Sequence, residues 1–288
     1  MPVSVILPAY NEEEAVARTV GELRQVLERS AVTMWEIIVV DDGSTDATSR
    51  MAEEAGARVI RHLQRLGYGK ALKDGIDATK YDAVAIMDAD RTYPPDRLPD
   101  LLAKFHEGYH MVVGQRLGCH VQDSAVKAPL RWLLKWLVEF TTGSKIPDVN
   151  SGFRIFDRRE ARSYFPRLCD TFSFTTSLTL AYMMNKRFVA YVPVEYRART
   201  GKSKVMLIRD SLRTLQYIVQ AVLYYNPIKI FLALAGGAVV FAGACLALGF
   251  LFDAGATALL LAAGVLSAIL IFALGLLADL LRQIMLKQ

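Results

Sequence analysis

The stretch Ala83-Val84-Ala85-Ile86-Met87-Asp88-Ala89-Asp90 joins a short apolar run to two carboxylates that stand two residues apart. The apolar run is typical of a strand, and in an extended chain residues i and i+2 share one face. Asp88 and Asp90 are therefore expected to project together from the end of a strand. Oxygen ligands in this arrangement suit a hard divalent cation, which would neutralise a diphosphate. The alternative is a polar strand exit with two solvated carboxylates.

The chain before this stretch alternates short strand-like runs with segments of helical spacing. The predicted strands are Val3–Leu7, Glu36–Val40, Arg58–Arg61 and Ala83–Met87, and the predicted helices are Glu12–Arg29, Thr48–Gly56 and Gly69–Ala78. This order predicts an α/β fold with a doubly wound parallel sheet, which binds ligands outside the carboxyl ends of its strands. Three polar motifs, at 8–11, 41–46 and 88–90, follow predicted strands and should meet at one edge of the sheet.

The pattern changes after Pro95, where a helix over Leu98–Glu107 and a strand over Met111–Val113 are expected. A helix over Lys127–Phe140 carries basic and aromatic side chains on neighbouring stripes, which is typical of a helix in the lipid headgroup zone. An amphipathic helix packed on the sheet is the alternative. A second candidate interfacial helix covers Met206–Val222.

Two long runs near the carboxyl end, 230–252 and 254–278, contain no charged residue. Each is long enough to cross a hydrocarbon core, which takes about 20 residues. A buried helical hairpin in a soluble core is the alternative. We predict a catalytic domain over residues 1–205, an interfacial helix and linker over 206–227, and a transmembrane hairpin over 228–282.

The charges that flank the two runs predict their orientation. Lys229 precedes the first run and Arg282 and Lys287 follow the second, while the turn between them has no basic residue. This distribution predicts that the catalytic domain lies on the cytoplasmic side of an integral membrane protein. The net charge of +5 is attributed to contact with anionic lipid rather than nucleic acid. Gly236 and Gly237 would permit close helix packing in a homo-oligomer.

Several motifs together resemble family 2 glycosyltransferases of the GT-A fold, which is Rossmann-like. These are Pro8-Ala9-Tyr10-Asn11-Glu12, Val40-Asp41-Asp42-Gly43-Ser44-Thr45-Asp46, and Asp88-Ala89-Asp90 with Pro94-Pro95. Ser151-Gly152-Phe153-Arg154, Phe172–Thr176 and Arg199–Lys204 look like the polyprenyl-phosphate branch, which includes dolichyl-phosphate mannose synthases and undecaprenyl-phosphate sugar transferases. The resemblance covers residues 2 to about 227.

The resemblance implies roles for residues that would bind a nucleotide-sugar donor. Nucleoside contacts fall to Pro8, Ala9, Tyr10 and Glu12, base binding to Asp42, and Mg²⁺ or Mn²⁺ binding to Asp88 and Asp90. Residues 11–14 are equally suited to an acidic first helical turn. The sequence departs from the family pattern at Arg91 and Thr92. Thr92 stands where relatives often have Gln, which leaves a third protein ligand to the metal unassigned.

A further candidate for the donor is the segment Gly67-Tyr68-Gly69-Lys70, which precedes a predicted helix. Backbone amides at a helix start and the ammonium of Lys70 would suit a diphosphate. An ordinary loop is the alternative.

A polyprenyl phosphate acceptor would need no general base, because a phosphate monoester is already largely anionic at pH 7. The protein must instead position two anions and compensate their charge. The candidate cations are Arg116, Arg131, Arg199, Lys202 and Lys204. The resemblance assigns acceptor-phosphate roles to Arg116 and Arg131 and places 199–204 over the active site. The alternative is that these cations only bind anionic lipid.

These observations predict an inverting, metal-dependent enzyme with Asp90, Arg116 and Arg199 as its catalytic residues. It would transfer one sugar from GDP-mannose or a UDP-hexose to polyprenyl phosphate at the cytoplasmic membrane face. A processive polysaccharide synthase is a rival, but Arg131-Trp132 lacks the Gln that such enzymes place before an Arg-Trp pair. A membrane scaffold that binds nucleotide sugars without turnover is the non-enzymatic rival.

Overall fold

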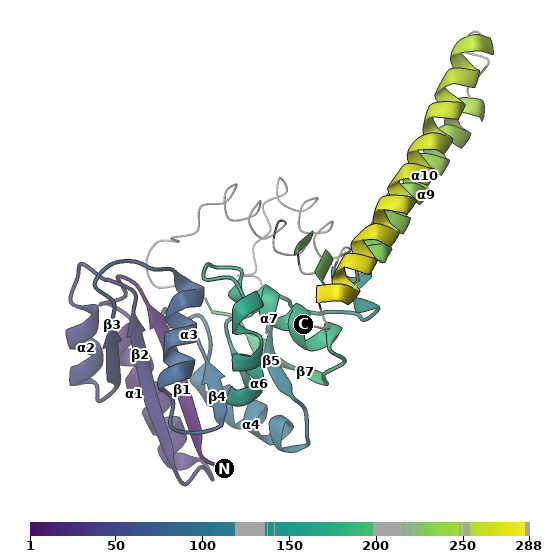
Figure 1. Cartoon of the computed structure of the whole chain (residues 1–288). Helices are drawn as coiled ribbons and strands as arrows, with labels where there is room; N and C mark the ends of the chain where they lie inside the picture. Colours follow the sequence, from purple (N-terminus) through teal and green to yellow (C-terminus); the bar gives the residue numbers. More distant parts are fainter. Residues whose placement is uncertain are drawn as a thin grey trace. The chain divides into compact units, whose positions relative to one another are not determined.

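The computed structural model describes residues 1–118, 142–197, 226–247 and 254–285, together with 136, 138–140, 216, 219, 220, 223, 224 and 249. The chain divides into two compact units, Met1–Ile218 and Val219–Gln288. The described part of the first unit contains a seven-stranded sheet with helices on both of its faces (Figure 1).

The sheet has the strand order β3-β2-β1-β4-β6-β5-β7. Its strands are β1 (Val3–Ala9), β2 (Trp35–Asp41), β3 (Arg58–Arg61), β4 (Ala83–Ile86), β5 (Met111–Leu117), β6 (Arg154–Asp157) and β7 (Val189–Glu195). The first four strands are parallel, as their apolar runs predict, and Ala9 pairs with Asp41 while Ile6 pairs with Ile86. β6 is antiparallel to both β4 and β5, so the sheet is mixed rather than wholly parallel.

The two faces of the sheet are covered by different helices. One face packs against α1 (Val16–Arg29), α2 (Thr48–Glu54), η1 (Pro95–Arg97) and α4 (Leu98–His106). The other packs against α3 (Tyr68–Ala78), α6 (Arg158–Ser163) and α7 (Phe174–Met184), with η2 (Phe165–Arg167) between the last two. Because both faces are buried, β1 carries apolar residues on both sides and does not alternate.

The first helix begins four residues later than predicted. The backbone of Asn11 is in the left-handed region at φ 52°, and its N–H donates to the Ser44 hydroxyl at 2.8 Å. The N–H of Glu12 donates to the Thr48 hydroxyl at 2.8 Å. These bonds tie residues 11 and 12 to the segment after β2, so the helix starts only at Val16 and the acidic residues 12–14 are not its first turn.

The described part of the second unit consists of α9 (Pro227–Ala247) and α10 (Ala254–Met285), which lie side by side (Figure 1). Both are long and apolar enough to cross a membrane, and at most 17% of their most apolar windows is buried. These windows are therefore mostly exposed, unlike the core helix of a soluble protein. Glycines in α10 allow close contact: a Cβ on Gly264 would lie 2.6 Å from Ala242, and one on Gly275 2.5 Å from Phe231.

We predict opposite effects for alanine at two helical glycines. A Cβ on Gly75 of α3 would lie 2.7 Å from Ile6 Cγ2 and 3.0 Å from Val40 Cγ2, whereas a Cβ on Gly21 of α1 meets nothing within 4 Å. Gly75→Ala should lower the free energy of unfolding by about 1–3 kcal/mol through overpacking. Gly21→Ala should raise it by up to about 1 kcal/mol because alanine favours helix. Urea unfolding of the full chain in detergent measures both, and a Gly75→Ala protein as stable as the parent would contradict the prediction.

Candidate active site

The expected convergence of polar segments is present at the edge of the sheet where the parallel strands end. The Asp42 N–H donates to Ala9 O at 2.9 Å, and the Thr45 N–H donates to Asn11 Oδ1 at 2.9 Å. β6 runs in the opposite direction, so it begins at this same edge. The segment Ser151–Phe153 therefore lies beside Asp88, a proximity that the spacing of motifs in the sequence does not reveal.

Asp88 is held between an aromatic hydroxyl and a glycine. The Tyr68 hydroxyl donates to Asp88 Oδ1 at 2.8 Å. A Cβ on Gly152 would lie 2.5 and 2.7 Å from the two carboxylate oxygens, so a side chain at this position would have to displace the carboxylate. Burial, and then the charge of Asp88, raise the pKa of Tyr68, which keeps its hydroxyl protonated as a donor. The orientation of Asp88 is therefore fixed by groups on α3 and before β6.

Asp90 is buried, and its carboxylate is fixed by its own loop. Oδ1 accepts from the Thr92 hydroxyl at 2.6 Å and from the Thr92 N–H at 3.2 Å. Thr92 therefore orients Asp90. Arg91 has a positive φ of 65°, and its guanidinium lies 3.8 Å from Glu22 of α1. Asp88 and Asp90 offer oxygen ligands in fixed orientations, which fits a hard cation such as Mg²⁺ or Mn²⁺.

The carboxylate of Asp42 is almost fully buried and accepts three hydrogen bonds. Oδ1 accepts from the Leu66 N–H at 2.8 Å and faces His62 Nδ1 at 2.9 Å, and Oδ2 accepts from the Gly67 N–H at 2.9 Å. On its other side, His62 Nε2 lies 3.1 Å from Asp74 of α3. Asp42 thus fixes the loop between β3 and α3, in addition to its predicted contact with the base.

The start of α3 is packed closely against the segment before α7. A Cβ on Gly67 would lie 2.5 Å from Asp170 O, and one on Gly69 2.3 Å from Cys169 O. The Lys70 N–H donates to Asp170 O at 3.1 Å, and its ammonium lies 2.5 Å from Asp74. The Lys70 groups that we predicted for a diphosphate therefore already have protein partners, and the role of Lys70 stays a prediction.

The predicted nucleoside residues lie at the end of β1. Pro8 and Ala9 belong to the buried strand itself, while Tyr10 and Glu12 are half-buried beyond it. The Arg65 guanidinium carbon lies 4.3 Å from the centre of the Tyr10 ring. A cation over an aromatic face stabilises both groups, so Arg65 holds Tyr10 from one side.

Arg116, at the end of β5, forms a two-pronged ion pair with Asp148. Nε lies 2.7 Å from Oδ2 and Nη2 lies 2.8 Å from Oδ1. Burial tends to raise the pKa of Asp148, but the guanidinium and two backbone N–H groups outweigh it, so the pKa lies below its usual value. The guanidinium carbon also lies 5.4 Å from the Tyr196 ring. These contacts fix the orientation of the Arg116 guanidinium.

A chain of ring contacts links Arg116 to Asp88. Tyr196 and Tyr93 have ring centres 5.2 Å apart, and the Tyr93 hydroxyl accepts from the Gly152 N–H at 2.8 Å. Burial raises the pKa of Tyr93 well above its usual value. The charge of Arg116 opposes this effect and that of Asp88 adds to it. Arg116 and Asp88 are thus linked through Tyr196, Tyr93 and Gly152.

Several predicted residues lie outside the described part of the chain: Arg131, Arg199, Lys202 and Lys204, with most of the helices expected over Lys127–Phe140 and Met206–Val222. Trp136 and Phe140 are described as helical, and their exposed rings stack at 5.2 Å. The roles of Arg131, Arg199, Lys202 and Lys204 stay predictions.

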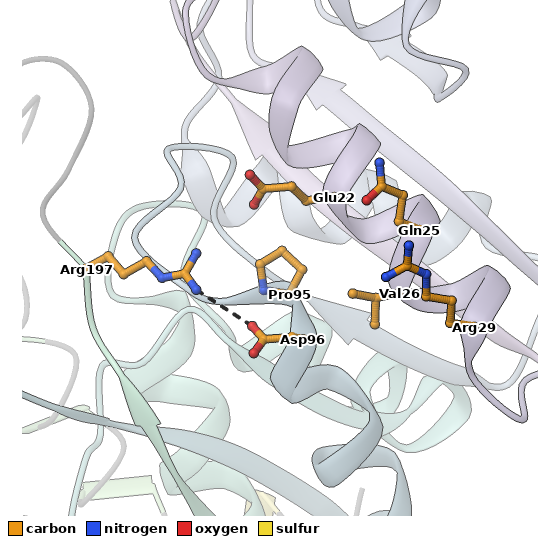
Figure 2. A pocket seen from close by; sticks show the side chains of 7 residues that line it. All are labelled: Glu22, Gln25, Val26, Arg29, Pro95, Asp96 and Arg197. Carbon is orange, nitrogen blue, oxygen red and sulfur yellow. Dashed lines mark ion pairs between the residues drawn. The ribbon is translucent and has the colours of Figure 1, made fainter.

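A cavity of about 310 Å³ lies against α1 and η1 (Figure 2). Its polar lining has both signs of charge, and Arg197 lies 3.8 Å from Asp96 across it. The residues around it are Glu22, Gln25, Val26, Arg29, Pro95, Asp96 and Arg197. None of the predicted donor or metal residues lines it.

Sequence reasoning missed the residues that hold the site in place. Tyr68 and Tyr93 carried no distinctive spacing. Asp148, the partner of Arg116, was not among the predicted site residues. The only signal for Gly152 was its place in the Ser151–Arg154 motif. Each of these contacts joins segments far apart in the sequence, which explains the omission.

We predict that the ion pair of Asp148 stabilises the fold in a pH-dependent manner. Asp148→Asn should lower the free energy of unfolding at pH 7 by about 1.5–3 kcal/mol, the range for a hydrogen bond to a charged group. Because the pKa of Asp148 is lowered in the folded protein, its contribution is present above the ordinary aspartate pKa of about 3.9. It is lost as the pH falls further.

Urea unfolding at pH 7 and pH 3 measures this difference. Asp100→Asn is the matched control, because Asp100 is half-exposed and pairs with Arg97 on one helix surface. That variant should change stability by less than about 1 kcal/mol. An equal deficit of Asp148→Asn at both pH values would contradict the prediction.

Comparison with known proteins agrees with this geometry. The model of the family described as "Glycosyl transferase family 2" matches residues 4–165. The chain is 28% identical over 257 residues to the undecaprenyl-phosphate 4-deoxy-4-formamido-L-arabinose transferase of Salmonella choleraesuis (strain SC-B67), covering 84% of this chain and 73% of that protein. The protein of the same name from Salmonella paratyphi B gives the same values.

Solved structures show the same fold. The glucosyl-3-phosphoglycerate synthase of Mycobacterium tuberculosis in complex with phosphoglyceric acid has a TM-score of 0.64 at 24% identity, covering 77% of this chain and 80% of that one. Its complex with Mn²⁺, uridine diphosphate and glucosyl-3-phosphoglycerate has a TM-score of 0.62 at 25% identity with the same coverage. With the family model matching more than half of its length, this chain belongs to glycosyl transferase family 2.

Proposed function

We propose that this protein is a membrane-anchored, inverting glycosyltransferase that uses polyprenyl phosphate as its acceptor. It takes one sugar from a nucleotide-diphosphate sugar at the cytoplasmic membrane face and forms a polyprenyl-phosphate monosaccharide. The acceptor class is supported by the relatives named undecaprenyl-phosphate transferases, which match 84% of the chain. The membrane anchor is supported by the two apolar helices α9 and α10.

The observation that carries the proposal is that two carboxylates and a guanidinium lie at the same edge of the sheet. We assign Asp88 and Asp90 to a cation at the donor diphosphate, and Arg116 is fixed by Asp148 with two of its five N–H donors. The remaining donors suit the oxygens of a phosphate. In this proposal the carboxylates hold the cation that binds the donor diphosphate, and Arg116 binds the acceptor phosphate. A site that holds two anions together needs both kinds of group.

In this proposal the acceptor phosphate attacks without help from a base. One of its oxygens forms a bond to the anomeric carbon, while the bond from that carbon to the diphosphate breaks on the opposite side. The electron pair leaves with the nucleoside diphosphate, and no proton has to move. Arg116 holds the attacking phosphate in line and compensates its charge. A bound Mg²⁺ or Mn²⁺ would supply Lewis-acid stabilisation of the leaving diphosphate.

Replacing a metal ligand tests this proposal directly. Asp90→Ala should reduce transfer at least about 100-fold, because Lewis-acid stabilisation of a leaving group is worth several kcal/mol. The measurement follows labelled sugar into the organic phase from vesicles that contain the full chain, polyprenyl phosphate, Mn²⁺ and a panel of nucleotide sugars. Asp100→Ala, at a half-exposed position of α4, should retain activity. Undiminished product from Asp90→Ala would remove the metal role.

A second variant tests how Asp88 is positioned. Gly152→Ala places a methyl group against the Asp88 carboxylate, so it should displace that ligand and reduce transfer by about 10- to 100-fold. Tyr68→Phe removes only the hydroxyl that orients Asp88 and should have a smaller effect in the same direction. Raising the Mn²⁺ concentration should restore part of the activity of both. If Gly152→Ala has the activity and Mn²⁺ dependence of the parent, Asp88 does not need this support.

A further inference from the structure

We propose that the loop between β3 and α3, residues 62–67, forms together with Phe172 a surface that docks the catalytic unit onto an anionic lipid bilayer. The inference rests on the proposed function, in which the acceptor phosphate lies at the membrane surface. It goes further by naming a part of the catalytic unit that meets the bilayer. This part lies outside the two segments that the sequence predicts to be interfacial, 127–140 and 206–222.

Three large apolar side chains are exposed at this place, and we call them the apolar surface: Leu63, Leu66 and Phe172. Leu63 is fully exposed, and Leu66 and Phe172 each expose 44% of their area. The Phe172 ring centre lies 6.0 Å from that of Tyr68, which directly follows the loop, so the two segments lie side by side. Exposed apolar side chains that gather in this way mark a contact with a membrane or with another protein.

The backbone of the loop is fixed, so the loop does not turn to bury its leucines. The N–H groups of Leu66 and Gly67 donate to the Asp42 carboxylate at 2.8 and 2.9 Å. The loop also passes so close to Gly43 that a Cβ there would lie 2.6 Å from the carbonyl carbon of Gln64. The leucine side chains are therefore held at the surface, where water surrounds them unless a partner covers them.

The same part of the chain is basic. Residues 57–73 contain five lysines and arginines and no acidic residue. Three of the five pair with carboxylates elsewhere in the fold. The other two, Arg61 and Arg65, flank Leu63 in the chain and are exposed. Anionic headgroups attract basic side chains while neighbouring apolar ones enter the layer below, so this combination fits a bilayer. A second copy of the chain would bring like charges together.

The loop lies at the edge of the sheet that carries the proposed site. Arg61 ends β3 and pairs with Asp41 at the end of β2, and Asp88 follows β4 at the same edge. A phosphate on a lipid tail stays at the depth of the headgroups, so a site that binds it faces the bilayer. The apolar surface then faces the bilayer as well, and the two apolar helices α9 and α10 supply the attachment to it.

Quenching by brominated lipid tests the docking. The full chain is placed in vesicles of phosphatidylglycerol and phosphatidylcholine with bromine on the acyl chains. The emission of one added tryptophan is taken as the difference from the parent, which has three tryptophans of its own. The emission added by Leu63→Trp should fall at least about two-fold relative to vesicles without bromine, because the side chain reaches the acyl boundary.

Phe188→Trp is the matched control for this measurement. Phe188 is 67% exposed and directly precedes β7, so it lies at the opposite edge of the sheet. The emission that this variant adds should be the same with and without bromine.

A second measurement separates docking from chemistry. Leu63→Asp places a charge where an apolar side chain meets the lipid, so the KM for long-chain polyprenyl phosphate in vesicles should rise about three- to ten-fold. Transfer to a short, water-soluble isoprenyl phosphate should change little, because that acceptor needs no bilayer. Phe188→Asp should leave both reactions as they are in the parent.

Equal quenching of Leu63→Trp and Phe188→Trp would overturn the inference. Protection of Leu63→Trp from aqueous iodide without quenching by bromine would also overturn it, because a protein partner or a second copy would then cover the surface. An equal loss of both reactions in Leu63→Asp would contradict it too. Quenching without any sugar transferred to polyprenyl phosphate contradicts the proposed function alone, whereas transfer without quenching contradicts only the docking surface.

Discussion

The buried guanidinium of Arg154 is the interaction on which the geometry of the site depends. Nε donates to Ser151 O at 3.0 Å, and Nη1 donates to Thr175 O and to the Thr179 hydroxyl, each at 3.0 Å. The residue has no exposed surface, and burial lowers its pKa. Arg154 thereby joins the beginning of β6 to α7 and holds the chain just before β6 in one place.

That placement determines what Gly152 can do. Gly152 lies so close to Asp88 that a single methyl group would displace the carboxylate, and its N–H meets the Tyr93 hydroxyl. Asp88, which we assign to a metal ion, is thus positioned by the buried guanidinium of Arg154 through the segment that contains Gly152. A buried charge of this kind is costly to desolvate, and its hydrogen bonds to Ser151, Thr175 and Thr179 offset part of that cost.

The sequence was informative wherever a contact is local or repeated. The apolar runs of β1 and β2 predicted parallel strands because both faces of the sheet are buried. The direction of β6 was not predictable, because periodicity shows that a segment is extended but not which way it runs. The start of α1 was wrong because hydroxyls of Ser44 and Thr48, more than 30 residues away, bind the amides before it. Asp148 and Tyr68 gain their meaning only from partners brought by tertiary structure.

The contacts between α9 and α10 have a consequence for the end of the chain. Ala242 faces Gly264 and Phe231 faces Gly275, which sets an antiparallel register between the two helices. In this register Pro227 is level with Asp279, so residues 280–285 of α10 continue beyond the first turn of α9 by about 9 Å. The two helices of the hairpin therefore differ in length. The end of α10 would project from a membrane whose thickness matches α9.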